Sequence, residues 1–240
     1  MQVASRQCVW KDTTATMGTI LAVEATVASM TVTIAQGVLA DGSKSVKVDW
    51  GDGTRDEYTS LANASHTYAA AGEYKVRISD DVKSFGYVKD GMTQASRDTL
   101  RELVSLGSKV TEITGYAFNN CRNMRGVMEL PNVTKIGDYA FGSTLGITDF
   151  ILPAMTKLEQ TSFYAGPSPT QIHADNVREI SIHFWEYYGE HLADMYLRNS
   201  TCEEIKAMAN FPFYANKKNP DARFHGSDGI VLVDGTVLPT

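Results

Sequence analysis

Histidine and carboxylate side chains that can bind zinc or move protons gather near residue 185 of this sequence. They are His183, Glu186, Glu190 and His191, and imidazole and carboxylate groups serve as zinc ligands and as general acids or bases. However, His183 stands beside Phe184-Trp185 in a variable turn, and the spacing does not support a helix that would align the four side chains. We therefore assign no metal or catalytic role to this cluster.

Two further patterns resemble catalytic motifs and fail on their details. His225 and Asp228 form another pair of titratable groups, but Gly226 and Gly229 around them indicate turn building. The string Gly142-Ser143-Thr144-Leu145-Gly146 comes nearest to a nucleophile elbow, yet it has Thr where that motif requires Ser. We expect no catalytic residue, no resident metal and no cofactor, and hence a protein that is not an enzyme.

Three aspartates near one turn, Asp49, Asp52 and Asp56, offer the oxygen ligands that Ca²⁺ prefers. The turn itself, Gly51-Asp52-Gly53, explains them without a metal, because the glycines permit positive φ and the Asp52 carboxylate can accept from nearby backbone amides. His66 could serve as a base, but no nucleophile or carboxylate is placed beside it by sequence. We expect both features to have structural roles.

Cysteine usage and charge exclude several classes of protein. Cys8, Cys121 and Cys202 are odd in number and far apart, which defines neither a disulfide framework nor a zinc site, so we expect small core residues. The net charge of −6 gives no basic footprint for nucleic acid. No apolar run reaches the roughly 18 residues of a membrane span. Residues 1–11 lack a secretory-signal pattern, so a signal either was trimmed or was never used.

The first half of the sequence has the pattern of a β-sandwich. Apolar and polar residues alternate along 30–34 and 46–50, which indicates half-buried strands. Asp41-Gly42-Ser43 supplies turn chemistry between them.

The motifs Trp50-Gly51-Asp52-Gly53-Thr54, His66-Thr67-Tyr68 and Gly72-Glu73-Tyr74-Lys75-Val76 follow in that order. Over residues 17–88 they resemble the PKD domain, an immunoglobulin-like sandwich, although its usual first strand is not obvious before Ser29. Tyr68 is expected to anchor its loop as a tyrosine corner does, through a hydroxyl bond to backbone.

The second half of the sequence repeats. Ile113, Ile136, Leu158 and Ile180 are spaced by 23, 22 and 22 residues, and an aromatic residue follows each of them five positions later. These aromatics are Phe118, Phe141, Phe163 and Trp185. Two apolar registers that keep one offset through four units predict a repeat array.

A short strand with an apolar triad accompanies each repeat. The triads Ile147-Phe150-Leu152 and Leu192-Met195-Leu197 have leucine-rich repeat spacing, and Pro169, Ile172 and Ala174 form a degenerate one between them. The first two, Leu100-Leu103-Leu106 and Met124-Val127-Leu130, carry one extra residue, so we expect a bulge or a register change there.

The fullest repeat, Val133-Thr134-Lys135-Ile136-Gly137-Asp138-Tyr139-Ala140-Phe141 after Leu130-Pro131, resembles the BspA-like leucine-rich repeat family, as does Ala117-Phe118-Asn119-Asn120-Cys121. The resemblance covers about residues 100–200. It implies a protein of bacterial surfaces and adhesins, in which PKD-like modules also occur.

The expected fold is therefore mainly β: a PKD-like β-sandwich in residues 1–88, with 1–16 as a candidate extension, then repeats in 89–200 and an α/β cap in 201–240. Stacked repeats need such a cap over the last apolar ridge. Thr201 and Glu204 have the spacing of a capping box, and 230–235 has the pattern of a closing hairpin.

Recognition is expected on the strand face of the array, because residues that alternate with the buried triads must point outward. The candidate binding residues are Glu129, Asp149, Ile151, Gln171, His173, Asp194 and Tyr196. They form a mixed polar and aromatic strip.

Two functions fit these observations. The first is recognition or adhesion at a bacterial cell surface, with a protein or glycan as ligand and without nucleic acid or membrane insertion. The second is a structural or receptor-binding component of a phage or phage-like particle, which the missing signal pattern favours. In that case a homo-oligomer and a location in the virion would be expected.

Overall fold

The computed structural model describes residues 18–34, 36–88, 92–159, 161–163, 166, 169–181, 192–208, 211 and 219–239. Several predictions lie outside these residues. They are the extension at 1–16, Cys8, the fourth aromatic Trp185, and the His183, Glu186, Glu190 and His191 cluster.

An antiparallel sheet of five strands forms one layer of the N-terminal half, in the order β5-β4-β7-β1-β9. The strands are β1 (Thr19–Ala25), β4 (Val46–Asp49), β5 (Arg55–Tyr58), β7 (Gly72–Ile78) and β9 (Leu100–Ser105). Side chains of β1 alternate between buried and half-buried, as strand geometry requires.

Shorter strands contribute the remaining buried side chains of this half. β2 (Met30–Ile34) pairs with β6 (Ala64–Tyr68), and β3 (Gln36–Leu39) pairs with β8 (Val82–Gly86), both antiparallel. The one-turn 3-10 helix η1 (Leu61–Asn63) precedes β6. Trp50, Val32 and Phe85 are fully buried in one common core. The strands predicted at 30–34 and 46–50 are confirmed, whereas PKD membership stays a prediction.

The two halves share their sheets. β9 pairs with β1, and β8 is extended in parallel by β10 (Glu112–Ile113) and β12 (Lys135–Ile136). The short helix α1 (Gln94–Arg97), capped by Thr93, lies between β8 and β9 in the chain.

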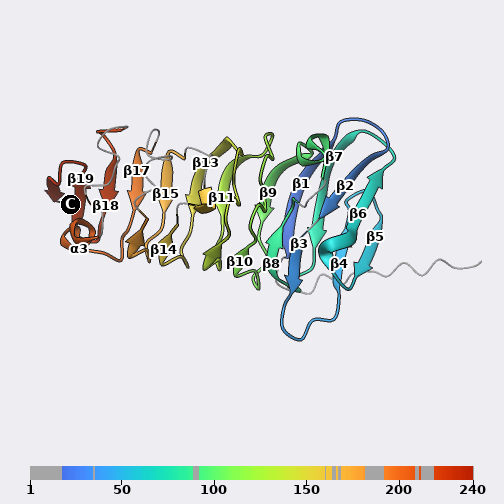
Figure 1. Cartoon of the computed structure of the whole chain (residues 1–240), viewed down its shortest axis with the longest axis horizontal. Coiled ribbons are helices and arrows are strands. Elements are labelled where there is room, and N and C mark those ends of the chain that lie inside the picture. Colours follow the sequence, from blue (N-terminus) through green and yellow to red (C-terminus); the bar gives the residue numbers. More distant parts are fainter. Residues whose placement is uncertain are drawn as a thin grey trace, which may run out of the picture.

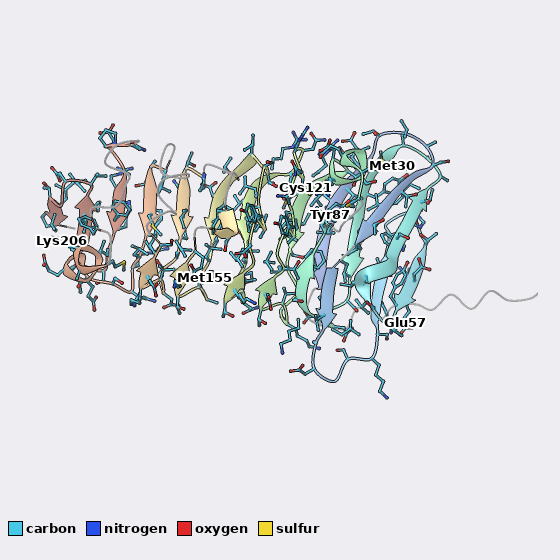
Figure 2. All side chains as sticks on the ribbon, in the orientation of Figure 1. Met30, Glu57, Tyr87, Cys121, Met155 and Lys206 are labelled. Atoms are coloured by element: carbon cyan, nitrogen blue, oxygen red, sulfur yellow. The ribbon has the colours of Figure 1, made fainter. Side chains whose placement is uncertain are left out.

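Tyr87 lies at this junction and is buried (Figure 2). Its N–H and that of Val88 donate to the Ala117 carbonyl oxygen, and its hydroxyl lies 2.5 Å from the Thr99 hydroxyl. The sheets of the N-terminal half therefore include strands from both sides of residue 88.

The repeats stack into an elongated array that runs from the N-terminal layers to the C-terminal end of the chain (Figure 1). Their main sheet has seven strands. The first five pair in parallel with their neighbours, and the fifth, sixth and seventh pair antiparallel. These are β11 (Arg125–Glu129), β13 (Gly146–Ile151), β15 (Gln171–His173), β17 (Asp194–Tyr196), β18 (Arg223–His225), β19 (Gly229–Leu232) and β20 (Val237–Pro239).

The two predicted apolar registers form ladders inside the array. Ile113 pairs with Ile136, and Leu158 of β14 (Lys157–Leu158) pairs with Ile180 of β16 (Glu179–Ile180), all four buried. Phe163 belongs to the 3-10 turn η2 (Thr161–Phe163). The buried rings of Phe118, Phe141 and Phe163 stack with centroids 5.4 and 5.7 Å apart. This confirms both registers within the described residues.

The strand triads are buried as predicted, with one exception in β11. Val127 was expected to point inward and is 43% exposed, whereas Met128 is 1% exposed. The pairing of β11 with β13 shifts register between Gly126 and Val127, and Gly126 has φ of +96°. The predicted bulge is confirmed, and it reverses the side-chain alternation after Gly126.

The C-terminal segment contains the predicted local features. Helix α3 (Cys202–Ala207) begins with a capping box between Thr201 and Glu204, and β19 and β20 form the predicted hairpin. Cys121 and Cys202 are buried free thiols, which confirms both as core residues. The capping role of 201–240 stays a prediction. Among the described residues, no helix has the length and apolar character needed to span a membrane.

Candidate recognition surface

Parallel pairing places the predicted binding residues in two rows on the outward face of the main sheet. Across neighbouring strands, one row is Asp149, Gln171, Asp194 and Arg223, and the other is Glu129, Ile151, His173, Tyr196 and His225. Between the rows, Phe150, Ile172 and Met195 point into the core. The seven candidate residues therefore lie on one face, as strand periodicity predicted.

Three aromatic rings stack along the second row. The His173 and Tyr196 ring centroids are 4.2 Å apart with planes at 9°, and the Tyr196 and His225 centroids are 4.4 Å apart at 19°. In-register pairing of β15, β17 and β18 brings these rings together, since residues opposite each other in adjacent strands stand side by side. We call His173, Tyr196 and His225 the ring row.

Arg198 contacts two members of the ring row, Tyr196 and His173. The Arg198 guanidinium carbon lies 5.3 Å from the Tyr196 ring centroid, and Nη2 lies 3.4 Å from His173 Nδ1. The Asp175 carboxylate accepts from both the backbone N–H and Nε of Arg198, at 3.0 and 3.2 Å. These contacts restrict the rotamers of the rings before any ligand is present.

Asp194 corrects one prediction, because it lies on the outward face but is only 6% exposed. Arg223 donates to Oδ2 from Nη2 at 2.9 Å, and His225 Nε2 donates to Oδ1 at 2.6 Å. Partial burial raises the pKa of Asp194, but hydrogen bonds from His225 and Arg223 outweigh it and lower the pKa below its ordinary value. Asp194 therefore orients the His225 ring and is largely covered itself.

The other predicted residues are more open. Glu129 is exposed, while Ile151 and Gln171 are half-buried. Asp149 accepts from the Thr148 and Thr170 hydroxyls at 2.8 and 3.2 Å. They form the polar surroundings of the ring row.

Sequence reasoning missed Arg223 and His225 as members of this surface. His225 was assigned to turn building, which is wrong, because it lies in β18 and continues the main sheet. Asp228 does have the local role expected, since Oδ1 accepts from the Cys202 N–H at 2.7 Å. The alternation in Arg223-Phe224-His225, like that in Asp194-Met195-Tyr196, was the available signal.

The aspartates near Gly51 each have their own donors. Asp49 accepts from Gly51 N–H and Arg55 Nε, and Asp52 accepts from Thr54 and from His66 Nε2 at 2.7 Å. Asp56 accepts from Trp50 Nε1 and the Tyr58 hydroxyl. In the ranges that the structure describes, no group of three or more His, Cys, Asp or Glu side chains is arranged to hold a metal.

The predicted backbone anchor in this region is confirmed. The Tyr68 hydroxyl donates to the Trp50 carbonyl oxygen at 2.8 Å. Gly51 has φ of +85°, and a Cβ there would lie 2.7 Å from the Lys75 carbonyl oxygen, so glycine is required. His66 packs in the fold as expected, with its ring stacked on Trp50 at a 5.2 Å centroid distance.

Comparison with protein families gives one match. The model of the BspA type leucine rich repeat region matches residues 97–216 in six copies. No curated protein and no solved structure matches the chain. The matched range includes β11, β13, β15 and β17, and with them all seven candidate binding residues.

Proposed function

This chain belongs to the BspA-type leucine-rich repeat family, and we propose that it binds a protein or glycan ligand through the ring row and its polar surroundings. Repeats of this family commonly serve in surface adhesion and recognition, and they are usually exposed at the surface or extracellular. We extend both properties to this chain as part of the proposal. The phage-particle alternative receives no support from the family match.

The observation that carries this proposal is the stacked ring row. Aromatic rings lose few rotamers on binding and bury much area, which is why Tyr is frequent among residues that dominate interface energies. Stacking of Tyr196 between two imidazoles fixes its ring in advance. A ligand then meets a preorganised surface, so less ordering entropy opposes binding.

Tyr196 offers a ligand its edge and hydroxyl, because both of its ring faces are covered by imidazoles. A ligand would meet the edges of two imidazoles and one phenol in a line across three strands, with Gln171 in the neighbouring row. Strand spacing repeats along the array at roughly 4.8 Å. An extended ligand that lies along the array can therefore contact several strands with the same kind of group.

The carboxylate–imidazole pair of Asp194 and His225 has the geometry that hydrolases use to orient a base. Within the described residues, however, the only hydrogen bond of the His225 side chain is the one to Asp194. Family members are typically non-enzymatic scaffolds. We assign this pair a positioning role in recognition.

The experiment is a binding screen against glycans and surface proteins with three forms of the chain. Replacing His173 and Tyr196 together by Ala is expected to weaken binding about tenfold or more, or about 1.4 kcal/mol. Tyr116→Ala is the matched control, because Tyr116 is 52% exposed and follows β10 rather than facing outward from the main sheet. A ligand that the double variant binds as tightly as the wild type would place recognition elsewhere.

A further inference from the structure

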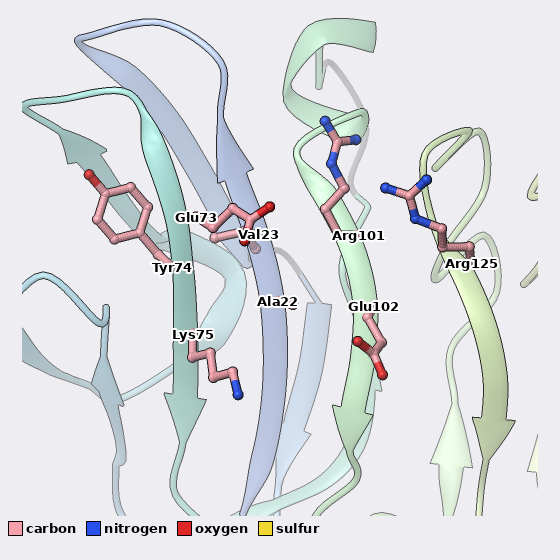
Figure 3. A pocket seen from close by; sticks show the side chains of 8 residues that line it. All are labelled: Ala22, Val23, Glu73, Tyr74, Lys75, Arg101, Glu102 and Arg125. Atoms are coloured by element: carbon pink, nitrogen blue, oxygen red, sulfur yellow. The ribbon is translucent and has the colours of Figure 1, made fainter.

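A groove of about 360 Å³ lies where the N-terminal sheet meets the first repeat strand. It is open to solvent on the outer face of β7, β1, β9 and β11, and Figure 3 shows its side chains. The lining residues are Ala22, Val23, Glu73, Tyr74, Lys75, Arg101, Glu102 and Arg125. None of them belongs to the ring row.

The groove exists because a small side chain stands between long ones. Ala22 pairs with Lys75 on one side and with Glu102 on the other. Its methyl group fills little of the space that the neighbouring side chains enclose, so it forms the floor. Glu73 and Lys75 on β7 form one wall, and Arg101 and Glu102 on β9 form the other (Figure 3).

Two arginine side chains, one from β9 and one from β11, line one end of the groove. The Arg125 side chain extends from β11 toward β9, and the Arg101 side chain extends along β9 beside it (Figure 3). Arg101 is fixed and already paired with a carboxylate, since Nε donates to Glu24 Oε2 at 2.6 Å, Nη2 also pairs with Glu24, and Nη1 donates to the Asp98 carbonyl oxygen at 2.8 Å. Arg125 is exposed and makes no hydrogen bond or ion pair within the part of the chain that the structure describes.

The pattern of charge selects among anionic ligands. A guanidinium such as Arg125 binds a carboxylate through two parallel N–H donors. Glu73 and Glu102 disfavour a ligand with many negative charges, because like charges in close approach repel. The same two carboxylates accept hydrogen bonds from neutral hydroxyl groups.

We propose that this groove binds an acidic sugar, with the carboxylate of a uronic acid unit held by Arg125. The sugar hydroxyls donate to Glu102 and Glu73 and accept from Lys75. A volume of about 360 Å³ is at the small end of ligand pockets, which suits one or two sugar rings. The site is separate from the ring row, so it stands whether or not the proposed function does.

The test is calorimetric titration of the full chain with digalacturonic acid and with the neutral digalactose of the same linkage. Digalacturonic acid is expected to bind at least about tenfold more tightly than digalactose. Arg125→Ala should abolish that preference, and Arg125→Lys should recover only part of it, because an ammonium group cannot bind a carboxylate through two donors. Arg122→Ala, in the exposed turn before β11, is the matched control and should bind as the wild type does.

Three results would overturn the proposal: equal binding of the acidic and neutral disaccharides, unchanged binding by Arg125→Ala, or equally tight binding of a hexaglutamate peptide. The His173→Ala/Tyr196→Ala variant should retain full binding of digalacturonic acid. A loss in that variant would place the acidic sugar on the ring row and also contradict the assignment to this groove.

Discussion

Replacing Phe141 by Ala removes the centre of the buried ring ladder. Phe141 is fully buried, and its ring contacts those of Phe118 and Phe163 in stacked geometry and that of Phe150 edge to face. A buried Phe→Ala change costs about 3–5 kcal/mol, because transfer energy is lost and a cavity remains. That range already includes contacts with neighbouring rings, and three aromatic partners place Phe141 in its upper part, so we expect a loss of about 4–5 kcal/mol.

The assay is urea unfolding of wild type and variant, followed by circular dichroism at several concentrations of denaturant. An unchanged slope with a lower midpoint would show that stability changed while the surface exposed on unfolding did not. For a chain of this size, each kcal/mol lowers the melting temperature by about 2–4 °C. Thermal unfolding should therefore shift by about 8–20 °C.

Leu145→Ala is the matched control, since Leu145 is 72% exposed in the turn before β13. It should change stability by no more than about 0.5 kcal/mol. If Phe141→Ala costs as little as this control, the ring ladder is not the core of the array and the reasoning fails.

Three further predictions concern metal, pH and the C-terminal segment. Neither a chelator nor millimolar calcium should shift the melting temperature, because Asp49, Asp52 and Asp56 already accept from protein donors; a rise of several degrees with calcium would contradict this. Partial burial raises the pKa of Asp52, but hydrogen bonds from Thr54 and His66 outweigh it and lower the pKa to about 2. Asp52→Asn should therefore destabilise the chain above about pH 4, with the difference from wild type lost between about pH 4 and 2; a difference independent of pH would refute the argument. Deleting residues 201–240 removes buried Ile205, Phe224 and Val231 and should cause aggregation; light scattering that finds a folded monomer would show that no cap is needed.

The repeats could be predicted because their core is periodic. Each unit places Ile, Leu or Phe at the same offset, and burial of that register is required in every turn of the array. The β11 triad was missed in one position, since the sequence shows that a residue is extra but not where it is inserted. The structure places the extra residue at Gly126, whose positive φ cannot be read from the sequence.

The ring row could be predicted only in part. His173 and Tyr196 are 23 residues apart, close to the repeat spacing, whereas Asp194 and Arg223 are 29 residues apart. Because this spacing is longer than the repeat, the sequence did not predict β18 or the ion pairs of Arg223 and His225 with Asp194. Pairing of β9 with β1 was also not foreseen, because contacts between residues about 80 positions apart leave no local pattern.

Hydroxyl-radical footprinting can show residue by residue whether a ligand binds across the ring row. The chain would be labelled alone and with the ligand identified by the binding screen. We expect the ligand to protect His173, Tyr196 and His225 together, while Tyr116 stays as reactive as in the free chain. Protection at Tyr116 or on β2 and β6, with the three rings unchanged, would contradict it.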